Sequence, residues 1–177
     1  MMMIVNRHHY LINMAIFKPK EKINRFDELN IEAYKDKYKL ILLDIDNTIA
    51  IPDSGNCSKQ AKAFIKKLQD NGFKVVIFSN NNEKRVKHFI GDLDVDYYHY
   101  ALKPLPFSYF KVCKKYHVKP SETIVLGDQL LTDILGANLS GCYGIYTKRL
   151  VEQDSKVTAR NRKIENFIWR HILHEEM

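Results

Sequence analysis

Two aspartates interrupt an apolar run that is otherwise typical of a buried strand. The stretch KLILLDIDNT, residues 39–48, carries Asp44 and Asp46 one residue apart. A carboxylate can attack phosphorus as a covalent nucleophile, and a second acid beside it can protonate the leaving group and later take a proton from water. Because residues two apart in an extended strand point the same way, we expect both carboxylates at one reaction centre.

Other polar side chains stand at the ends of the later apolar runs. Ser79, Lys103 and Asp128 each end or follow such a run, and Asp133 lies five residues after Asp128. In a parallel α/β sheet, ligands bind outside the carboxyl ends of the strands. We therefore expect these groups to gather at one edge of the sheet with the two aspartates of the first run.

This combination of groups indicates phosphoryl chemistry with a divalent cation. Four carboxylates in one cleft repel one another unless a cation lies among them, and oxygen ligands beside a phosphate suit Mg²⁺. The hydroxyl of Ser79 and the ammonium of Lys103 can hold phosphoryl oxygens and neutralise their charge. Asn80 and Asn81, which follow the serine, are either substrate contacts or the start of the next helix.

The elements that must position these residues alternate along the chain. Continuous apolar runs predict strands at 39–45, 73–79, 95–101, 123–128 and 142–147, and helical stripes predict helices at 58–72, 82–93, 106–116 and 131–141. Alternation with short connections predicts a three-layer α/β fold, a parallel sheet with helices on both faces.

We expect one domain over residues 1–177. Its core spans about 38–150, a lead-in at 1–37 packs on that core, and a helix at about 158–177 ends the chain. The apolar stripe of the C-terminal helix is predicted to be Ile164, Phe167, Ile168, His171 and Ile172.

The composition is that of a globular protein with a basic surface: 45% of residues are hydrophobic, 28% are charged, and the net charge is +7. The positive charge is spread along the chain, which allows an anionic partner but predicts no specific nucleic-acid binding. The three cysteines form no CxxC pair, which fits a reducing compartment. Because no apolar run approaches the roughly 18 residues of a membrane span, we expect a cytoplasmic protein.

The motifs resemble those of the haloacid-dehalogenase-like (HAD) phosphohydrolases. DIDNT at 44–48 matches the DxDxT signature, Ser79 matches the second motif, Lys103 the third, and GDQLLTD at 127–133 the fourth. Within HAD subfamily IIIA, the chain is similar to the YqeG group over most of its length. The resemblance implies the HAD Rossmann-like fold, with a sheet of about five strands in the order 5-4-1-2-3.

The resemblance also implies a role for each residue of the first motif. Asp44 would be the nucleophile and a Mg²⁺ ligand. Asp46 would be the general acid and base, with its backbone carbonyl on the metal. Thr48 would help to fix the loop that carries Asp46.

The later motifs are implied to hold the phosphoryl group and the metal. Ser79, Asn80 and Lys103 would bind the substrate, and Lys103 would also assist catalysis. Asp128 would coordinate Mg²⁺, directly or through water. Asp133 would assist at the metal or hold Lys103.

The connections leave no room for a large cap domain. One helix and one strand fill each of the segments from Thr48 to Ser79 and from Ser79 to Lys103. We therefore expect an open site and a phosphorylated substrate that is large or surface-bound. The resemblance points to phosphatidylglycerophosphate, on which related proteins act. A spread positive surface suits peripheral contact with the inner face of an anionic membrane.

Other interpretations stay open. A receiver-type signalling domain also clusters aspartates, a hydroxyl and a lysine, but its phospho-accepting aspartate follows the third strand, where this chain has Lys103. A non-catalytic binding protein could keep the fold, although the intact acidic motifs argue against it. Asp133 is also compatible with a structural role in the first turn of the next helix.

Overall fold

The computed structural model describes residues 15–152, 154 and 156–175. Six parallel strands form one sheet in the order β1-β6-β5-β2-β3-β4. Their bounds are β1 Glu21–Ile23, β2 Leu40–Leu43, β3 Lys74–Phe78, β4 Asp96–Tyr98, β5 Thr123–Gly127 and β6 Tyr143–Thr147. The chain leaves β2 on one side through β3 and β4 and returns on its other side through β5 and β6. The ligand crevice of such a sheet lies where β2 and β5 end.

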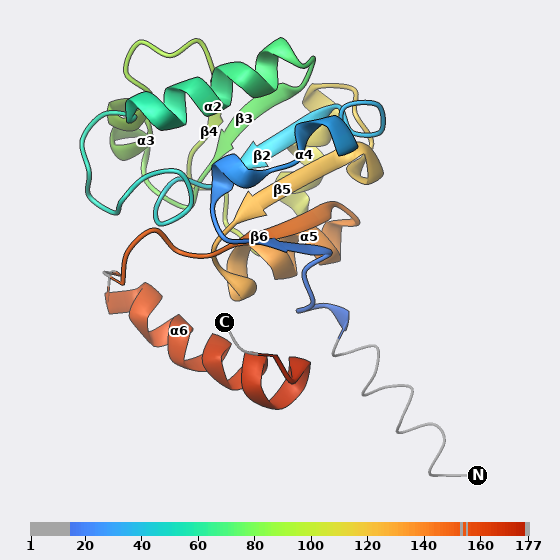
Figure 1. Ribbon diagram of the computed structural model, residues 1–177, viewed down its shortest axis with the longest axis vertical. Helices are drawn as coiled ribbons and strands as arrows, with labels where there is room; N and C mark the ends of the chain where they lie inside the picture. The colour runs from blue at the N-terminus through green and yellow to red at the C-terminus, as the bar shows by residue number, and fades with distance from the viewer. Residues whose placement is uncertain (1–14, 153, 155, 176–177) are drawn as a thin grey trace.

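Helices cover both faces of the sheet, and α6 lies below it in Figure 1. They are α2 Lys59–Asp70, α3 Glu83–Ile90, α4 Pro106–Lys115, α5 Leu135–Ser140 and α6 Lys156–Ile168, with π-helical turns at Leu130–Ile134 and Trp169–Leu173. Short 3-10 turns lie at Phe26–Glu28, Ile31–Ala33 and Pro120–Glu122. Strand β2 is buried on both faces because alternate side chains enter different clusters: Ile41 and Leu43 pack with α2 and α3, and Leu40 and Leu42 pack with α4 and α5.

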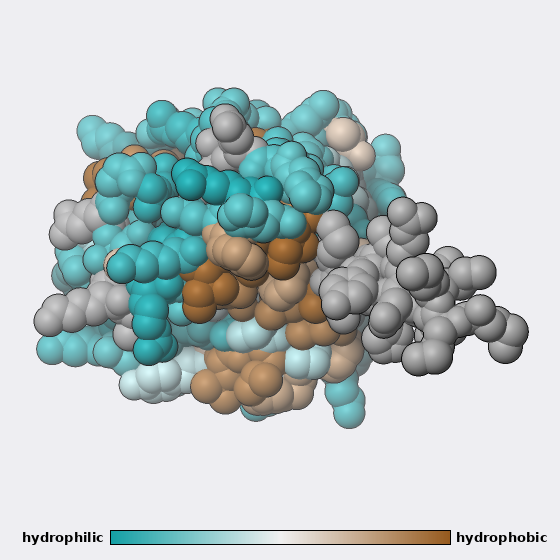
Figure 2. Space-filling view, turned by 90° about the horizontal axis from the view of Figure 1, so that it is seen from below, coloured by the Kyte–Doolittle hydropathy of each residue, from teal (hydrophilic) through white to brown (hydrophobic). Residues whose placement is uncertain are grey.

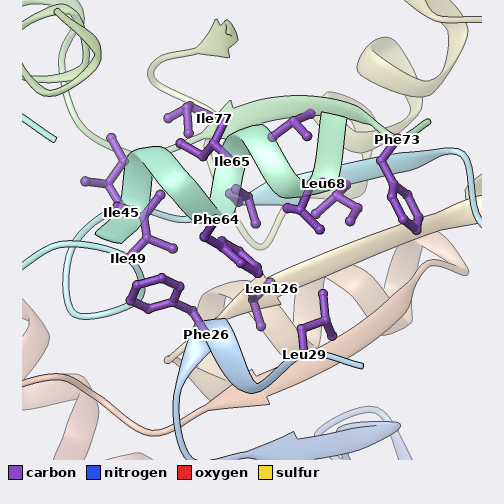
Figure 3. Packing of buried hydrophobic residues seen from close by; sticks show 14 of the residues in the cluster. Phe26, Leu29, Ile45, Ile49, Phe64, Ile65, Leu68, Phe73, Ile77 and Leu126 are labelled. Carbon is purple, nitrogen blue, oxygen red and sulfur yellow. The ribbon is translucent and has the colours of Figure 1, made fainter. Parts of the chain in front are cut away.

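The described part of the lead-in packs against the helix that follows β2. Phe26 meets Phe64 of α2 edge-on, with 5.2 Å between the ring centroids, and Figure 3 shows both rings in the core. Helix α2 has the predicted N-cap, Ser58, whose Oγ accepts a hydrogen bond from the Ala61 N–H at 3.1 Å. This packing fixes the loop between β2 and α2, which borders the ligand crevice.

The prediction of about five strands missed one. The five predicted strands take their predicted order, and β1 extends the sheet at one edge by pairing in parallel with β6, with Glu21 opposite Ile145. The segment EKI is only three residues long and carries two charges. Because it is so short and polar, it lacks the apolar run or alternation that predicts a strand.

The predicted stripe of the C-terminal helix was wrong in part. Of the predicted stripe, Ile168 is buried, whereas Ile164 and Phe167 are 49% and 58% exposed and His171 is exposed as well. Trp169, outside the predicted stripe, is buried. Figure 2 looks at the molecule from the side on which α6 lies and shows hydrophobic atoms in the middle of this face. The buried face of α6 carries Arg162 and Glu165 among its apolar residues, and this pair leads directly to the site.

Candidate active site

The ends of the central strands bring the predicted site residues to one edge of the sheet. Asp44 follows β2, Ser79 follows β3, Lys103 lies in the loop after β4, and Asp128 and Asp133 follow β5. A pocket of about 420 Å³ opens there. It is lined by Asp44, Asp46, Asn47, Pro52, Asp53, Ser79, Asn80, Asn81, Lys103, Gln129, Thr132, Asp154, Thr158 and Asn161.

The Lys103 ammonium lies between two buried carboxylates. Its Nζ is 2.6 Å from Asp44 Oδ1 and 2.6 Å from Asp133 Oδ1. Burial lowers the pKa of Lys103, but the two carboxylates raise it by more, so the amine stays protonated. Asn80 fixes the backbone at this lysine: its Oδ1 accepts the Lys103 N–H at 2.7 Å, and its Nδ2 donates to the Lys103 carbonyl at 3.0 Å. The site therefore holds a fixed positive charge against Asp44.

Three buried carboxylates form a cluster of the kind that binds a metal ion. One oxygen from each of Asp44, Asp128 and Asp133 lies within 4.8 Å of the other two. The Thr48 hydroxyl joins two of them, at 3.3 Å from Asp44 Oδ2 and 3.1 Å from Asp128 Oδ1. The Asp46 carboxylate is not part of this cluster in the described structure.

Negative charge in this cluster is only partly balanced by protein cations. Burial raises the pKa of Asp44 to about 6, although Lys103 opposes the shift. Burial likewise raises the pKa of Asp128 to about 8, and Arg162 opposes it. The neighbouring carboxylates add to both shifts because like charges disfavour ionisation. A hard divalent cation with oxygen ligands fits this donor set and would supply the missing positive charge.

Asp46 has different hydrogen-bond partners from Asp44. Its Oδ2 accepts a hydrogen bond from Asn81 Nδ2 at 2.6 Å, and its Oδ1 lies 2.7 Å from Arg85 Nη2 of α3. Strand β2 ends before the two aspartates, and Asn47 has a φ of 62°. Strand β2 thus stops short of this loop, but Asp44 and Asp46 both line the pocket. Sequence reasoning also missed Arg85.

Ser79 is buried at the end of β3. Its Oγ accepts the Asn81 N–H at 3.2 Å, and its backbone carbonyl accepts the N–H of Ala101 at 3.0 Å. These contacts hold the loop after β3 and the loop after β4 side by side. The serine and the lysine predicted to bind a phosphoryl group thus line one pocket with Asp44.

Helix α6 supplies residues that sequence reasoning did not assign to the site. The Arg162 guanidinium donates hydrogen bonds to both the backbone and the side chain of Asp128. Its Nη1 donates to the backbone carbonyl at 2.6 Å, and its Nη2 donates to the carboxylate. Arg162 is itself held by Glu165 Oε2 at 2.9 Å and Asp154 Oδ2 at 3.3 Å. Asn161 of the same helix lines the pocket. The motif signals end at Asp133, and nothing in the sequence pattern ties residue 162 to residue 128.

The parallel sheet, with an acidic site at its switch point, is the HAD Rossmann-like fold. Solved structures with the same fold include the cobalt-bound deoxy-D-mannose-octulosonate 8-phosphate phosphatase of Haemophilus influenzae, with a TM-score of 0.54 and 14% identity over 77% of this chain and 90% of that chain. An uncharacterized protein from Listeria monocytogenes also has a TM-score of 0.54, with 18% identity over 67% of this chain and 84% of that one.

The sequence model of the mitochondrial PGP phosphatase family matches residues 2–152, and the chain belongs to this family. It is 33% identical over 153 residues to the Bacillus subtilis protein named "Probable phosphatase YqeG", which covers 86% of this chain and 89% of that protein. It is also 26% identical over 179 residues to the mitochondrial phosphatidylglycerophosphatase GEP4 of Saccharomyces cerevisiae, covering 93% and 96% of the two chains. The predicted resemblance, fold class and enzyme class are confirmed.

Proposed function

We propose that the protein is a magnesium-dependent phosphomonoester hydrolase that works through an aspartyl-phosphate on Asp44 and takes phosphatidylglycerophosphate as its substrate. The observation that carries the proposal is the placement of Asp44, which lines the pocket with Lys103 Nζ 2.6 Å from its Oδ1. Asp128 and Asp133 lie close enough to share a cation with it. A nucleophile, a phosphoryl-binding cation and a metal cluster are the parts that phosphoryl transfer requires.

The first step forms a bond from an Asp44 oxygen to phosphorus and breaks the bond from phosphorus to the ester oxygen. Ser79 and Lys103 hold the non-reacting phosphoryl oxygens. Protonated Asp46 gives its proton to the departing oxygen, so the products are the free alcohol, the aspartyl-phosphate and ionised Asp46. Because both Asp46 oxygens accept hydrogen bonds here, Asp46 must release Asn81 or Arg85 before it can donate a proton.

The second step reverses the proton transfer. Asp46 takes a proton from water as the water oxygen attacks phosphorus. The bond between phosphorus and Asp44 breaks, inorganic phosphate leaves, and both aspartates return to their starting forms. Mg²⁺, when bound by Asp44, Asp128, Asp133 and the Asp46 carbonyl, supplies a Lewis acid that neutralises phosphoryl charge.

The phosphatidylglycerophosphate proposal draws its support from the family and from the shape of the site. Two yeast relatives carry this activity in their names: GEP4 of Saccharomyces cerevisiae and the Schizosaccharomyces pombe protein named "Probable phosphatidylglycerophosphatase, mitochondrial". Between β2 and β3, and between β3 and β4, the described chain holds only the single helices α2 and α3. Within the described residues, no cap domain therefore separates the pocket from a lipid headgroup at a membrane surface, and α6 contributes Thr158 and Asn161 to the pocket lining. We further propose peripheral contact with an anionic membrane.

The test is a phosphatase panel on the full chain with Mg²⁺ and with a chelator. The panel contains phosphatidylglycerophosphate in vesicles, a nucleotide monophosphate, a sugar phosphate and an aryl phosphate. We expect phosphate release from the vesicles with Mg²⁺ only, and none from Asp44→Asn that melts like the wild type. Equal turnover by Asp44→Asn contradicts the nucleophile, and a stable phospho-aspartate without release favours a receiver domain.

A further inference from the structure

Exposed hydrophobic side chains gather around the loop that carries Lys103. The part of the chain that the structure describes has nine large hydrophobic side chains that are exposed, and five of them lie within eleven residues. We call these five the rim surface: Tyr100, Leu102, Leu105, Phe107 and Phe110. Each is between 47% and 59% exposed. Clustered exposure of this kind marks an interaction site, whereas scattered single residues do not.

Two residues of the rim surface have an unfavourable backbone conformation. Tyr100 has a φ of 45° and Leu102 a φ of 54°, in the left-handed region that residues with a Cβ disfavour. Each such residue is less stable there than in an extended or right-handed conformation. Glycine would remove that cost, but it would also remove the apolar side chain. A strained backbone that holds hydrophobic side chains in solvent indicates that the exposure itself has a use.

A groove beside the rim surface adds aromatic and basic groups. The groove measures about 700 Å³, and its lining includes Tyr98, Tyr100, Phe107, Lys111 and Lys115. The two lysines are exposed on α4, and the Lys111 Nζ lies 5.5 Å from the centre of the Tyr98 ring. Aromatic side chains flanked by lysines suit the interface of an anionic bilayer, where rings sit at the headgroups and each cation gains from the negative surface potential.

The position of the rim surface ties it to the reaction. Lys103, which contacts Asp44 and Asp133, stands in sequence between Leu102 and Leu105, and it is buried while both leucines are about half exposed. A membrane that meets the rim surface therefore lies beside the loop that carries Lys103, one of the residues that line the pocket. Docking there would bring a lipid phosphate close to Asp44.

We infer that the rim surface is where the protein docks on an anionic membrane. The inference rests on the proposed function, because it names the surface that delivers a lipid phosphate to that site. Among helices of the described residues, none combines the length and apolar character needed to cross a bilayer. The rim surface offers half-exposed side chains for this docking.

The experiment compares Phe107→Gln/Phe110→Gln with the wild type and with a matched control, Leu139→Gln. Both phenylalanines are on α4, away from the strained loop. Leu139 is 47% exposed near the end of α5, and because α5 runs back from β5, that end lies at the opposite edge of the sheet. Binding is measured by sedimentation with vesicles rich in phosphatidylglycerol. Turnover is measured on phosphatidylglycerophosphate in the same vesicles and on a soluble aryl phosphate.

We expect the double variant to bind vesicles about 10- to 100-fold more weakly, because two half-exposed phenylalanines no longer enter the interface. Its vesicle turnover falls with binding, while its aryl phosphate turnover and that of Leu139→Gln stay at the wild-type level. The inference is overturned if the double variant binds vesicles as tightly as the wild type. It is also overturned if vesicle binding is lost in Ile164→Gln/Phe167→Gln on α6 and not in the double variant. The inference is also overturned if the wild type is a dimer and the double variant is a monomer, because the rim surface would then pair two copies of the chain. Failure of the proposed function is distinct, since the wild type then hydrolyses neither phosphate.

Discussion

Replacing Arg162 by methionine should lower the free energy of unfolding by about 3–5 kcal/mol, the typical cost of removing one partner from a buried ion pair. The guanidinium contacts the carboxylates of Asp128, Glu165 and Asp154, none of which is more than 5% exposed. Methionine keeps much of the apolar stem but leaves these three buried carboxyl groups without the cation and the hydrogen-bond donors that they share. Asp154 retains Arg149 at 3.4 Å, so Asp128 and Glu165 account for most of the loss.

Urea denaturation at pH 7 without divalent ions measures this loss directly. In a thermal melt the same loss lowers Tm by about 6–20 °C, at about 2–4 °C per kcal/mol for a chain of this length. Arg160→Met is the matched control, because Arg160 is exposed on the same helix, and its effect should stay within about 0.5 kcal/mol. If Arg162→Met is as stable as Arg160→Met, the argument from burial is refuted.

The same variant should also weaken Mg²⁺ binding. Arg162 bonds both the carboxylate and the backbone carbonyl of Asp128, and loss of such a partner behind a metal ligand typically weakens affinity by about 10- to 100-fold. Isothermal titration calorimetry of the substrate-free protein measures the affinity. Unchanged or tighter binding by Arg162→Met would show that the arginine does not position Asp128 for the metal.

Three further predictions follow from single contacts. Gly127→Ala should reduce turnover by about 100-fold, because a Cβ there overlaps the Asp133 side chain and displaces it. The control, Gly55→Ala, should match the wild type, because its Cβ would lie at an ordinary contact distance of 3.6 Å from His88 Nε2. Cys57 should resist iodoacetamide at pH 8 until the protein unfolds, because it is buried and burial raises its pKa to about 11; rapid alkylation of the folded protein would contradict this. Mg²⁺ at about 100 times its Kd should add about 2.7 kcal/mol of stability that a chelator removes in a denaturation titration.

The sequence was sufficient for the framework of the fold because apolar runs and helical stripes are strong local signals. β2 to β6 fall within the five predicted runs, and their polar ends predicted the edge at which the site lies. β1 is different, since three residues with two charges form a strand only because β6 offers a free edge. Strand β1 forms because it pairs with a strand far away in the sequence, and a local sequence pattern does not reveal such pairing.

The site was predictable to the level of motif residues but not of their partners. Asp44, Ser79, Lys103 and Asp128 were found because each follows a strand. The partners of Asp46 are Asn81 and Arg85, which lie 35 and 39 residues away in the chain. The contact of Arg162 with Asp128 joins residues 34 apart through tertiary packing. The hydrophobic periodicity of α6 also gave the wrong buried face. The method assumes that apolar residues occupy the inner side of a helix, whereas this inner side carries Arg162 and Glu165.

The central claim is that Asp44 carries the phosphoryl group, and the most direct measurement is mass spectrometry of the Asp46→Asn variant after a rapid quench with an aryl phosphate. An aryl leaving group departs without a proton, so the first step proceeds, while loss of the Asp46 base slows the second. The account predicts a phosphoryl group on the peptide that contains Asp44, and none in the Asp44→Asn/Asp46→Asn variant. Steady turnover by Asp46→Asn with Asp44 unmodified, or a phosphoryl group on another residue, would contradict it.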